Sequence, residues 1–352
     1  MTEGGPPPQR RRSRPTMREV AALAGVAVKT VSRVVNGVPT VDPVIVARVR
    51  DAAERLGYRP NLTASSLRRG DGRTATIGML VEDSANPFSA TLTRTVENAA
   101  RARGVLVLVG SLDEDPAREQ ELARALIDRG VDGLVIVPAG RDHSYLISEQ
   151  RSGTCVVFVD REPRLLDADA VVCDNRQGAV TAVRHLLAAG HRRIAYLGDR
   201  ASIHTAAQRF DGYRHALELA RIECDEEIVC QTGASEETAI AATERLLALP
   251  DPPTALFTSQ NLVTIGASRA LRNLGRQNTV AHVGFDDFPL ADMLSPGISV
   301  IAQDIGAMGR TAAEVLFSRL DGDQSPSRTV IVPTRLIQRG SGEIATDGPH
   351  HG

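Results

Sequence analysis

The chain of 352 residues has few of the features that mark several large classes of protein. It contains no tryptophan, and aromatic residues make up only 3% of it. No apolar run approaches the roughly 20 residues that a membrane-spanning helix requires. We therefore expect no membrane association, and at about 150 residues per domain the length suggests two domains with real hydrophobic cores.

Cysteine is also scarce. Cys155, Cys173, Cys224 and Cys230 show neither C-x-x-C spacing nor the density of a disulfide framework, so they are expected to be thiols in a reducing compartment. The first fifteen residues are rich in proline and arginine and lack the apolar segment of a signal peptide. These features predict a cytoplasmic protein.

Motifs of catalysis and cofactor binding are missing as well. The sequence has no G-x-G-x-x-G, G-x-x-x-x-G-K-[ST], H-E-x-x-H or G-x-S-x-G segment. Its eight histidines form no cluster with metal-ligand spacing. We therefore expect no cofactor, no metal and no enzymatic activity. A solute-binding protein of a transporter is also disfavoured, because it would require export.

The net charge of the whole chain is close to zero, but its two parts carry large charges of opposite sign. The formal charge is −2, whereas residues 1–73 carry fourteen Arg or Lys against six Asp or Glu, a net +8. The remainder carries 27 basic and 37 acidic residues, a net −10. A basic segment on an acidic body indicates nucleic acid as a partner of that segment. A merely solvated basic tail is the alternative that charge alone leaves open.

The basic segment contains the signals of three short helices. Thr16 and Glu19 form a T-x-x-E capping box that opens a helix to about Ala24, where Gly25 follows. A second helix is predicted over 28–35. A third begins after Asp42 with proline at its first position and stops at Gly57.

The second helix carries the functional signal. Lys29, Ser32 and Arg33 fall on one face, whereas Val31, Val34 and Val35 fall on the other. A short helix fixed by its apolar face can present Lys and Arg to guanine in the DNA major groove. A charged outer face of any small helical unit is the alternative.

Beyond residue 76 the pattern changes to apolar runs that alternate with amphipathic segments. Strands are predicted at 76–82, 105–110, 133–138, 155–160, 171–174, 193–199, 254–259 and 280–287, and helices at 88–103, 116–129, 176–189, 235–249 and 262–274. Apolar strands of this kind form parallel sheets covered on both faces. A barrel or two doubly wound lobes would fit, and connection rules favour open sheets.

Taken together, these residues resemble a known family. The run TMREVAALAGVAVKTVSRVVNG at 16–37 resembles the DNA-binding domain of the LacI/GalR family of bacterial transcription regulators. The resemblance continues through GYRPN at 57–61, the segment 77–88, DNRQG at 174–178, HLLAAGHRRIAYLG at 185–198 and GFDD at 284–287. It covers about residues 16–340.

The resemblance implies an all-α helix-turn-helix head joined by a hinge helix to an α/β body. That body would be periplasmic-binding-protein-like, with two doubly wound lobes. The implied domains are a disordered basic tail (1–15), the helix-turn-helix domain (16–60), the hinge helix and linker (61–73), the effector-binding and dimerisation domain (74–340) and a frayed C-terminus (341–352). The N-lobe would take about 74–173 and 304–331, and the C-lobe about 174–303 and 332–340.

The resemblance also implies which residues contact DNA. Base contacts fall at Val28, Lys29 and Arg33; backbone contacts fall at Thr16, Thr30, Ser32 and Asn36. Minor-groove contacts of the hinge fall at Asn61, Ser65 and Leu67. In the family a serine usually precedes the recognition helix. This chain has Ala27 at that position, and the loss of the serine cap costs the helix about 1 kcal/mol of stability.

Effector contacts are implied as well, mostly just beyond the predicted strands. They are Asn86, Phe88, Asp160, Arg161, Arg209, Gln260, Asn261, Asp286 and Gln303. Carboxylates, arginines and amides around an aromatic face suit a polyhydroxylated ligand. Other roles remain open: a lobe-bridging ion pair for Arg209, a capping residue at Asp286, or a core residue at Phe88.

A second departure bears on the ligand. The family commonly has Asn-Asp where this chain has Gln260-Asn261, so one carboxylate is missing. A sugar or sugar derivative is expected; a nucleobase, a phosphorylated metabolite or no effector are the alternatives.

No heptad segment follows Gly340, so a homodimer is expected, bound to a pseudo-palindromic double-stranded DNA operator in the bacterial nucleoid. Neither induction nor corepression is favoured.

The implied hinge generates the first prediction. A nine-residue helix at 61–69 is shorter than the about 12–15 residues that are stable alone, so it should form only on DNA beside its partner. Leu67→Ser removes an apolar wedge and should weaken operator binding by at least about tenfold while effector binding stays intact. A gel-shift titration measures this, and unchanged operator affinity would contradict the assignment.

Overall fold

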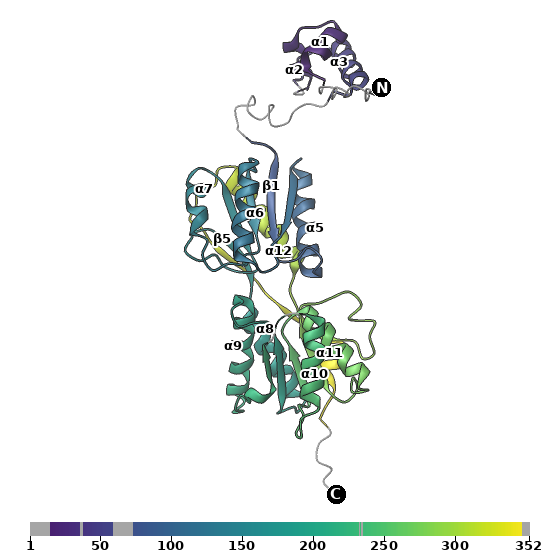
Figure 1. Ribbon diagram of the computed structural model, residues 1–352, viewed down its shortest axis with the longest axis vertical. Helices are drawn as coiled ribbons and strands as arrows, with labels where there is room; N and C mark the ends of the chain where they lie inside the picture. The colour runs from purple at the N-terminus through teal and green to yellow at the C-terminus, as the bar shows by residue number, and fades with distance from the viewer. Residues whose placement is uncertain (1–14, 36–37, 59–72, 232, 234, 347–352) are drawn as a thin grey trace, which may run out of the picture. The chain divides into compact units, whose positions relative to one another are not determined.

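A computed structural model describes residues 15–35, 38–58, 73–231, 233 and 235–346 of the chain (Figure 1). It divides into two compact units, a head and a body, with the boundary between Thr74 and Ala75. Among the described residues, none of the helices has the length and apolar character needed to span a membrane.

The described part of the head contains three helices, at the positions that the sequence predicts. They are α1 (Met17–Ala24), α2 (Val28–Val35) and α3 (Pro43–Leu56). The capping box is confirmed: Glu19 N donates to Thr16 Oγ1 at 3.4 Å, and Thr16 N donates to Glu19 Oε2 at 2.6 Å. Gly25 and Gly57 end α1 and α3 in the left-handed conformation, which glycine adopts without strain.

A small apolar core holds the head together. Val20, Val31 and Val49, one from each helix, are fully buried or nearly so. Arg48 on α3 donates through Nη2 to the carbonyl oxygens of Ala24 and Gly25, so it also satisfies the end of α1. Each helix therefore keeps its place through one apolar face, which leaves the other faces for contacts outside the head.

The body contains two open six-stranded sheets, which excludes a barrel. The N-lobe sheet has the order β11-β5-β4-β3-β1-β2, and the C-lobe sheet has the order β12-β10-β9-β8-β6-β7. The N-lobe strands are β1 (Thr76–Val81), β2 (Leu106–Ser111), β3 (Gly133–Ile136), β4 (Cys155–Val159), β5 (Asp169–Cys173) and β11 (Thr329–Val332). The C-lobe strands are β6 (Ile194–Gly198), β7 (Val229–Gln231), β8 (Ala255–Thr258), β9 (Ala281–Phe285), β10 (Ser299–Ala302) and β12 (Arg335–Ile337). All described pairings are parallel except β10 with β12.

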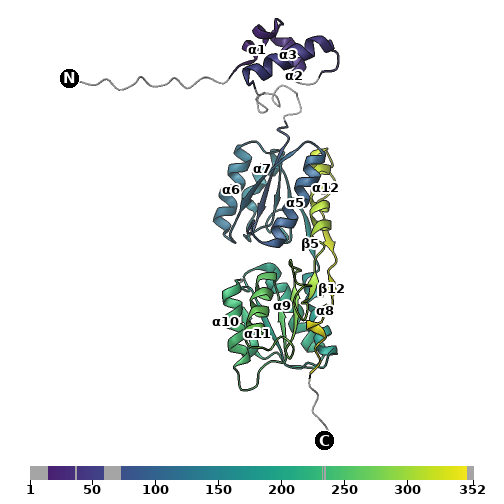
Figure 2. The same cartoon turned by 90° about the vertical axis from the view of Figure 1, so that its right-hand side faces the viewer.

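Helices cover both faces of each sheet. The N-lobe helices are α5 (Pro87–Ala102), α6 (Pro116–Asp128), α7 (Ile147–Arg151) and α12 (Ile305–Leu320); those of the C-lobe are α8 (Asn175–Ala188), α9 (His204–Leu219), α10 (Glu236–Leu247) and α11 (Asn261–Asn273). Figure 2 shows α6 on one side of the N-lobe sheet, with α5 and α12 on the other. Alternate strand residues serve the two layers: Met79 packs with α5 and α12, and Leu80 packs with α6. The expectation of buried, doubly wound sheets is therefore confirmed.

Several elements were missing from the sequence prediction. It gave eight strands, and the structure adds β7, β10, β11 and β12. Each of these has only three or four residues, too few for a period to show. The helices α7, α9 and α12 were also missed. Six of the sixteen residues of α9 are polar or charged and exposed or half-buried. Its buried face contains Thr205 and Arg209, so the helix lacks a continuous apolar stripe.

The lobes are joined by three crossings of the chain, after β5, after β10 and between β11 and β12. Two crossings are tied together, because Thr334 N donates to Asp174 Oδ1 at 2.7 Å. Glycine permits close packing beside them: a Cβ at Gly178 of α8 would lie 2.8 Å from the ring of Phe285. Helix α8 therefore lies directly on the C-lobe sheet where the chain enters it.

The expectation of frayed residues from 341 onward is wrong for 341–346. A 3-10 helix, η3 (Ser341–Glu343), packs on the C-lobe with Ser341 buried. The ring nitrogen His191 Nε2 lies 2.7 Å from the carbonyl oxygen of Ile344, and His185 Nε2 lies 2.6 Å from Glu343 Oε1. These partners lie more than 150 residues away in the sequence, so a local polar composition gave no sign of them.

A buried carboxylate holds together the loops at the carboxyl ends of the N-lobe strands. Glu119 on α6 is 1% exposed. It accepts hydrogen bonds from the backbone N–H groups of Ala139 at 2.7 Å and Gly140 at 3.0 Å. It also accepts one from the hydroxyl of Tyr145 at 2.9 Å. A single side chain thus satisfies donors from two segments that follow β3.

Glu119→Ala should lower the free energy of unfolding by about 3 kcal/mol, because three partly buried donors lose their acceptor at about 1–3 kcal/mol each. The matched control is Glu121→Ala, an exposed residue of the same helix, which should change it by less than about 0.5 kcal/mol. Thermal and urea unfolding of both variants measure the difference. Equal stabilities would show that Glu119 is not structural.

Candidate functional site

The first site is the outer face of α2 in the head. Val31 and Val34 of this helix are buried, and Val35 packs against the same apolar cluster, as predicted. Lys29 and Arg33 are exposed on the opposite side, and Val28 at the start of the helix is 43% exposed. The helix is thus fixed to its domain by one face and presents two cations and an apolar side chain from the other.

Neighbouring groups orient this face. One guanidinium nitrogen of Arg33, Nη2, donates to Thr40 Oγ1 at 2.6 Å, which holds the side chain along the turn after α2. Ala27 supplies only its carbonyl oxygen, which accepts from Thr30 N at 2.9 Å and Val31 N at 3.2 Å. The departure at Ala27 therefore leaves the first turn without a side-chain cap. Amides at a helix start bind anions such as phosphate.

The remaining predicted DNA contacts divide into described and undescribed residues. Thr30 and Ser32 are half-buried on α2, and the hydroxyl of Thr16 is engaged in the capping box, 2.9 Å from Glu19 Oε2. Asn36, Asn61, Ser65 and Leu67 lie outside the described residues, as does the basic tail up to residue 14.

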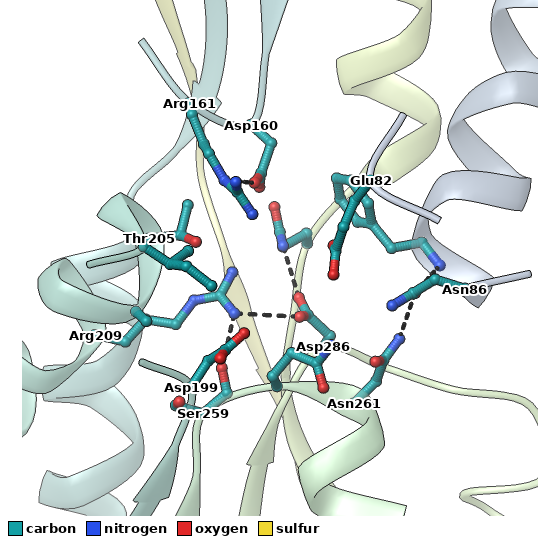
Figure 3. Close-up of a pocket in the computed structure, with 15 residues that line it drawn as sticks. Glu82, Asn86, Asp160, Arg161, Asp199, Thr205, Arg209, Ser259, Asn261 and Asp286 are labelled. Atoms are coloured by element: carbon teal, nitrogen blue, oxygen red, sulfur yellow. Dashed lines mark hydrogen bonds and ion pairs between the residues drawn. The ribbon is translucent and has the colours of Figure 1, made fainter. Parts of the chain in front are cut away.

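The second site is a cavity in the body, lined by residues of both lobes (Figure 3). All nine residues that the resemblance assigns to the effector line it: Asn86, Phe88, Asp160, Arg161, Arg209, Gln260, Asn261, Asp286 and Gln303. Glu82, Asp199, Ile203, Thr205, Ala206 and Ser259 complete the lining.

Strand ends explain why these residues meet. Glu82, Asp160, Asp199, Ser259 and Asp286 each directly follow a strand, namely β1, β4, β6, β8 and β9. Carboxyl ends of parallel strands share one edge of a sheet, and ligands bind at that edge. Because the two lobes have the same strand order, Asp160 and Asp286 occupy equivalent positions. Both adopt positive φ, 70° and 69°, which aspartate tolerates better than most residues.

A buried arginine organises the C-lobe side of the cavity. Arg209 is 4% exposed and stacks on the ring of Phe285, with 3.9 Å to the centroid. Its Nε donates to Asn175 Oδ1 at 2.7 Å, and Nη1 donates to the carbonyl oxygen of Ser259 at 2.7 Å. Nη1 also lies 3.3 Å from Asp286 Oδ2. These partners all belong to the C-lobe, so the suggested lobe-bridging role of Arg209 is wrong.

Amides make the contact between the lobes instead. Asn261 Nδ2 donates to Asn86 Oδ1 at 3.0 Å. Asn86 also caps α5, because Phe88 N donates to the same oxygen at 3.0 Å. Gln260 caps α11 in the same manner, with Leu262 N donating to Oε1 at 2.7 Å. The departure from Asn-Asp to Gln260-Asn261 thus supplies a helix cap and a bridge between the lobes.

The other open roles are also decided. Phe88 belongs to the hydrophobic core and lines the cavity, with 9% of its surface exposed. Asp286 accepts from Gln303 Nε2 at 2.6 Å, and the capping contact to Phe288 N comes from the neighbouring Asp287. Asp286 is therefore a cavity residue rather than a cap.

The N-lobe side contains a second arginine that is already paired. Both terminal nitrogens of Arg161 donate to the carboxylate of Glu114, one of them at 2.8 Å. Nη1 also donates to the carbonyl oxygen of Pro138 at 2.8 Å. Although burial opposes the charge, this pairing with Glu114 raises the pKa of Arg161. Sequence reasoning missed Glu114, because it lies 47 residues from its partner.

Carboxylates dominate the remaining lining. Burial, and then the charge of Glu114, raises the pKa of Glu82 to about 7. Burial also raises the pKa of Asp160 and of Asp199 above the usual range. Figure 3 shows the Glu82 carboxylate pointing into the cavity. Glu82 and Asp199 could have been found from the sequence, since each is the last residue of a predicted strand, 76–82 and 193–199.

Family models match the chain in two segments. Residues 16–61 match the bacterial regulatory proteins of the lacI family, and residues 183–342 match the periplasmic binding protein-like domain. Over 344 residues, the chain is 35% identical to the HTH-type transcriptional regulator PtxS of Pseudomonas aeruginosa, which covers 94% of this chain and 96% of PtxS.

Solved structures agree with these matches. The structure of a complex between the regulator CelR and cellobiose is 31% identical, with a TM-score of 0.69 over 93% of this chain and 100% of CelR. The lac repressor dimer bound to operator and an anti-inducer has a TM-score of 0.81 over 93% of this chain and 98% of the repressor; at 24% identity it supports the fold. This chain therefore belongs to the lacI family of bacterial regulatory proteins, and it is a DNA-binding transcriptional regulator rather than an enzyme.

Proposed function

We propose that the protein represses transcription as a homodimer on a pseudo-palindromic operator and is switched by a sugar or sugar derivative bound between the lobes of its body. It would act in the bacterial cytoplasm, on DNA of the nucleoid. The observation that carries this proposal is the pair of sites in one chain: a fixed helix with exposed Lys29 and Arg33, and a polar cavity between two lobes.

In the DNA complex, α2 would lie in the major groove. Lys29 and Arg33 would donate to base edges, and Val28 would contact a thymine methyl group. Thr16, Thr30 and Ser32 would contact phosphates and fix the register. For Asn36, Asn61, Ser65 and Leu67 the support is the resemblance alone.

A homodimer is supported by the edge of the N-lobe sheet. Strand β2 is the edge strand, and two of its large apolar residues, Leu106 and Val109, are 61% and 42% exposed. Exposed apolar side chains on an edge strand favour a partner surface. A twofold dimer would place two copies of α2 in successive major grooves.

The sugar proposal is supported by the polar lining. Carboxylates and amides such as Asp160, Asp286 and Gln303 accept hydrogen bonds from hydroxyl groups, and Phe88 offers an apolar surface to a sugar ring. The related CelR binds cellobiose in its solved complex.

Switching would follow from linkage. The contact between Asn86 and Asn261 joins the lobes, so a ligand between them changes the free energy of the closed arrangement. If that arrangement favours or disfavours the DNA-bound dimer, effector and operator must change each other's affinity by the same factor.

The DNA face generates a prediction. Arg33→Ala should cost about 1–3 kcal/mol on the preferred operator and relax specificity at one base pair, because the bidentate contact to guanine is lost. Thr30→Ala should instead weaken binding evenly across sequences, since it removes a phosphate contact. Fluorescence anisotropy on genomic fragments selected by the wild-type protein, and on their point variants, separates the two patterns.

An even loss across all sequences for Arg33→Ala would contradict its role as a base contact. Salt provides a second measure. With about 6–10 phosphate contacts, the wild-type dimer should lose about 10³–10⁵ in affinity between 50 and 200 mM salt.

The cavity generates another prediction. A thermal-shift screen of sugars, sugar phosphates and purines should identify a stabilising compound. Arg209→Ala should then weaken that compound at least about tenfold, because it leaves the buried Asp286 without its cationic partner. Asn261→Ala provides a milder variant. If both variants fold and bind the compound as tightly as the wild type, the ligand lies elsewhere.

A further inference from the structure

The two arginines of the cavity are both neutralised inside the protein. Arg209 faces Asp286, and both terminal nitrogens of Arg161 are held by Glu114, whose side chain is 12% exposed. Arg161 Nε lies 3.5 Å from Asp160 Oδ2. A guanidinium that is to bind a phosphate or carboxylate must offer its paired donors to the ligand. Here the fork of Arg161 already binds a carboxylate of its own chain.

Glu114 can reach Arg161 because of a turn in the backbone. It lies between β2 and the start of α6, with a φ of 55°, next to Asp113 with a φ of 54°. Two successive residues in the left-handed region reverse the chain there. The turn brings the Glu114 side chain over the end of β4, where Arg161 begins the following loop.

Glu82, in contrast, has no such partner. Glu82 makes no side-chain hydrogen bond or ion pair with any residue that the structure describes, and its carboxylate points into the cavity (Figure 3). Asp199 Oδ1 accepts a hydrogen bond from the backbone N–H of Arg200 at 2.7 Å and lies 3.9 Å from Nε of that exposed arginine. The lining therefore contains four carboxylates and two guanidinium groups, and Glu114 adds a fifth carboxylate just behind it.

An orphaned acceptor points in the same direction. Gln303 is 9% exposed, and its Nε2 donates to Asp286. Its Oε1 is buried and has no donor within hydrogen-bond distance in the described structure. A buried carbonyl oxygen without a partner costs free energy. A ligand with hydroxyl or amine donors would satisfy it, whereas an anionic group would not.

We propose that the cavity selects neutral or amine-bearing polyhydroxylated ligands and rejects sugar phosphates and sugar acids. Two residues set this selection: Glu114 by occupying the fork of Arg161, and Glu82 by adding an unpaired carboxylate. The inference rests on the proposed effector site and narrows the class of ligand that it takes.

The test uses matched ligands that differ only in charge. Isothermal titration at pH 8, above the pKa of about 7 of Glu82, compares glucose, glucosamine, glucuronate and glucose 6-phosphate, and the corresponding galactose and ribose series. In each series that binds, the wild-type protein should bind the neutral or amino member at least about tenfold more tightly than the anionic one. An acid or a phosphate that binds as tightly as its neutral parent would overturn the proposal.

Three variants assign the effect to residues. Glu114→Gln frees the charge of Arg161, and Glu82→Gln removes the unpaired carboxylate, so each should improve the relative affinity of the anionic member by about tenfold. Glu121→Gln is the control, because it removes one charge from an exposed site on α6 outside the cavity lining. Equal effects of all three would reduce the selection to net charge and contradict the roles of Glu82 and Glu114.

A ligand-free measurement keeps the two proposals separate. The pKa of Glu82 is raised to about 7 from 4.5, so the folded protein holds its proton more tightly than the unfolded chain. Glu82 therefore costs stability progressively as the pH rises from about 4.5 to 7. Glu82→Gln should raise the melting temperature at pH 8 and leave it unchanged near pH 4.5.

Two outcomes then differ. If no sugar binds but the melting profile of Glu82→Gln behaves as expected, the sugar effector is wrong and the carboxylate surplus stands. If the melting temperature of Glu82→Gln equals that of the wild type at every pH, other groups offset the charge of the Glu82 carboxylate. The proposed selection against anionic ligands is then wrong.

Discussion

The buried guanidinium of Arg209 connects the parts of the C-lobe that form the floor of the cavity. It contacts α8 through Asn175, the end of β8 through the carbonyl oxygen of Ser259, and the end of β9 through Asp286. Its flat face lies on Phe285, itself part of the hydrophobic core. An arginine in this position needs every one of these partners, because an unpaired buried charge is strongly destabilising. The direction of Asp286, and through it of Gln303, follows from that requirement.

The N-lobe solves the equivalent problem in a different way. Asp160 stands where Asp286 stands in the C-lobe, at the end of the third strand of the same order and with the same positive φ. The cation beside it, Arg161, is adjacent in sequence and is turned toward Glu114, whereas Arg209 comes from a helix and faces the aspartate. The two lobes have the same strand order, but Asp160 and Asp286 therefore lie in different electrostatic environments. This asymmetry leaves Glu82 without a hydrogen-bonded cation among the described residues and gives the cavity its surplus of acceptors.

The head and the body divide the charge of the chain between two tasks. The cations of α2 lie on the exposed face of a helix fixed by valines, where a polyanion can reach them. The cations of the cavity are buried and paired, where a polyanion gains little from them. A sum of −2 conceals this division, because arginine is exposed on α2, where we propose that it contacts DNA, and is an internal counter-ion in the body.

The sequence by itself determined the elements whose signals are local. Capping at Thr16 and Asp42, the valine face of α2, and the apolar strands that end at Asp160 and Asp286 depend on residues within a few positions of one another. The resemblance then named nine residues, and the structure brings all nine into one cavity. Only the tertiary structure decided which charges are available there. The pairing of Glu114 with Arg161, the bridge from Asn86 to Asn261 and the fixing of residues 341–346 by His185 and His191 join positions 47 to 175 residues apart. Such contacts depend on how strands are ordered in space, and no periodicity along the chain records that order.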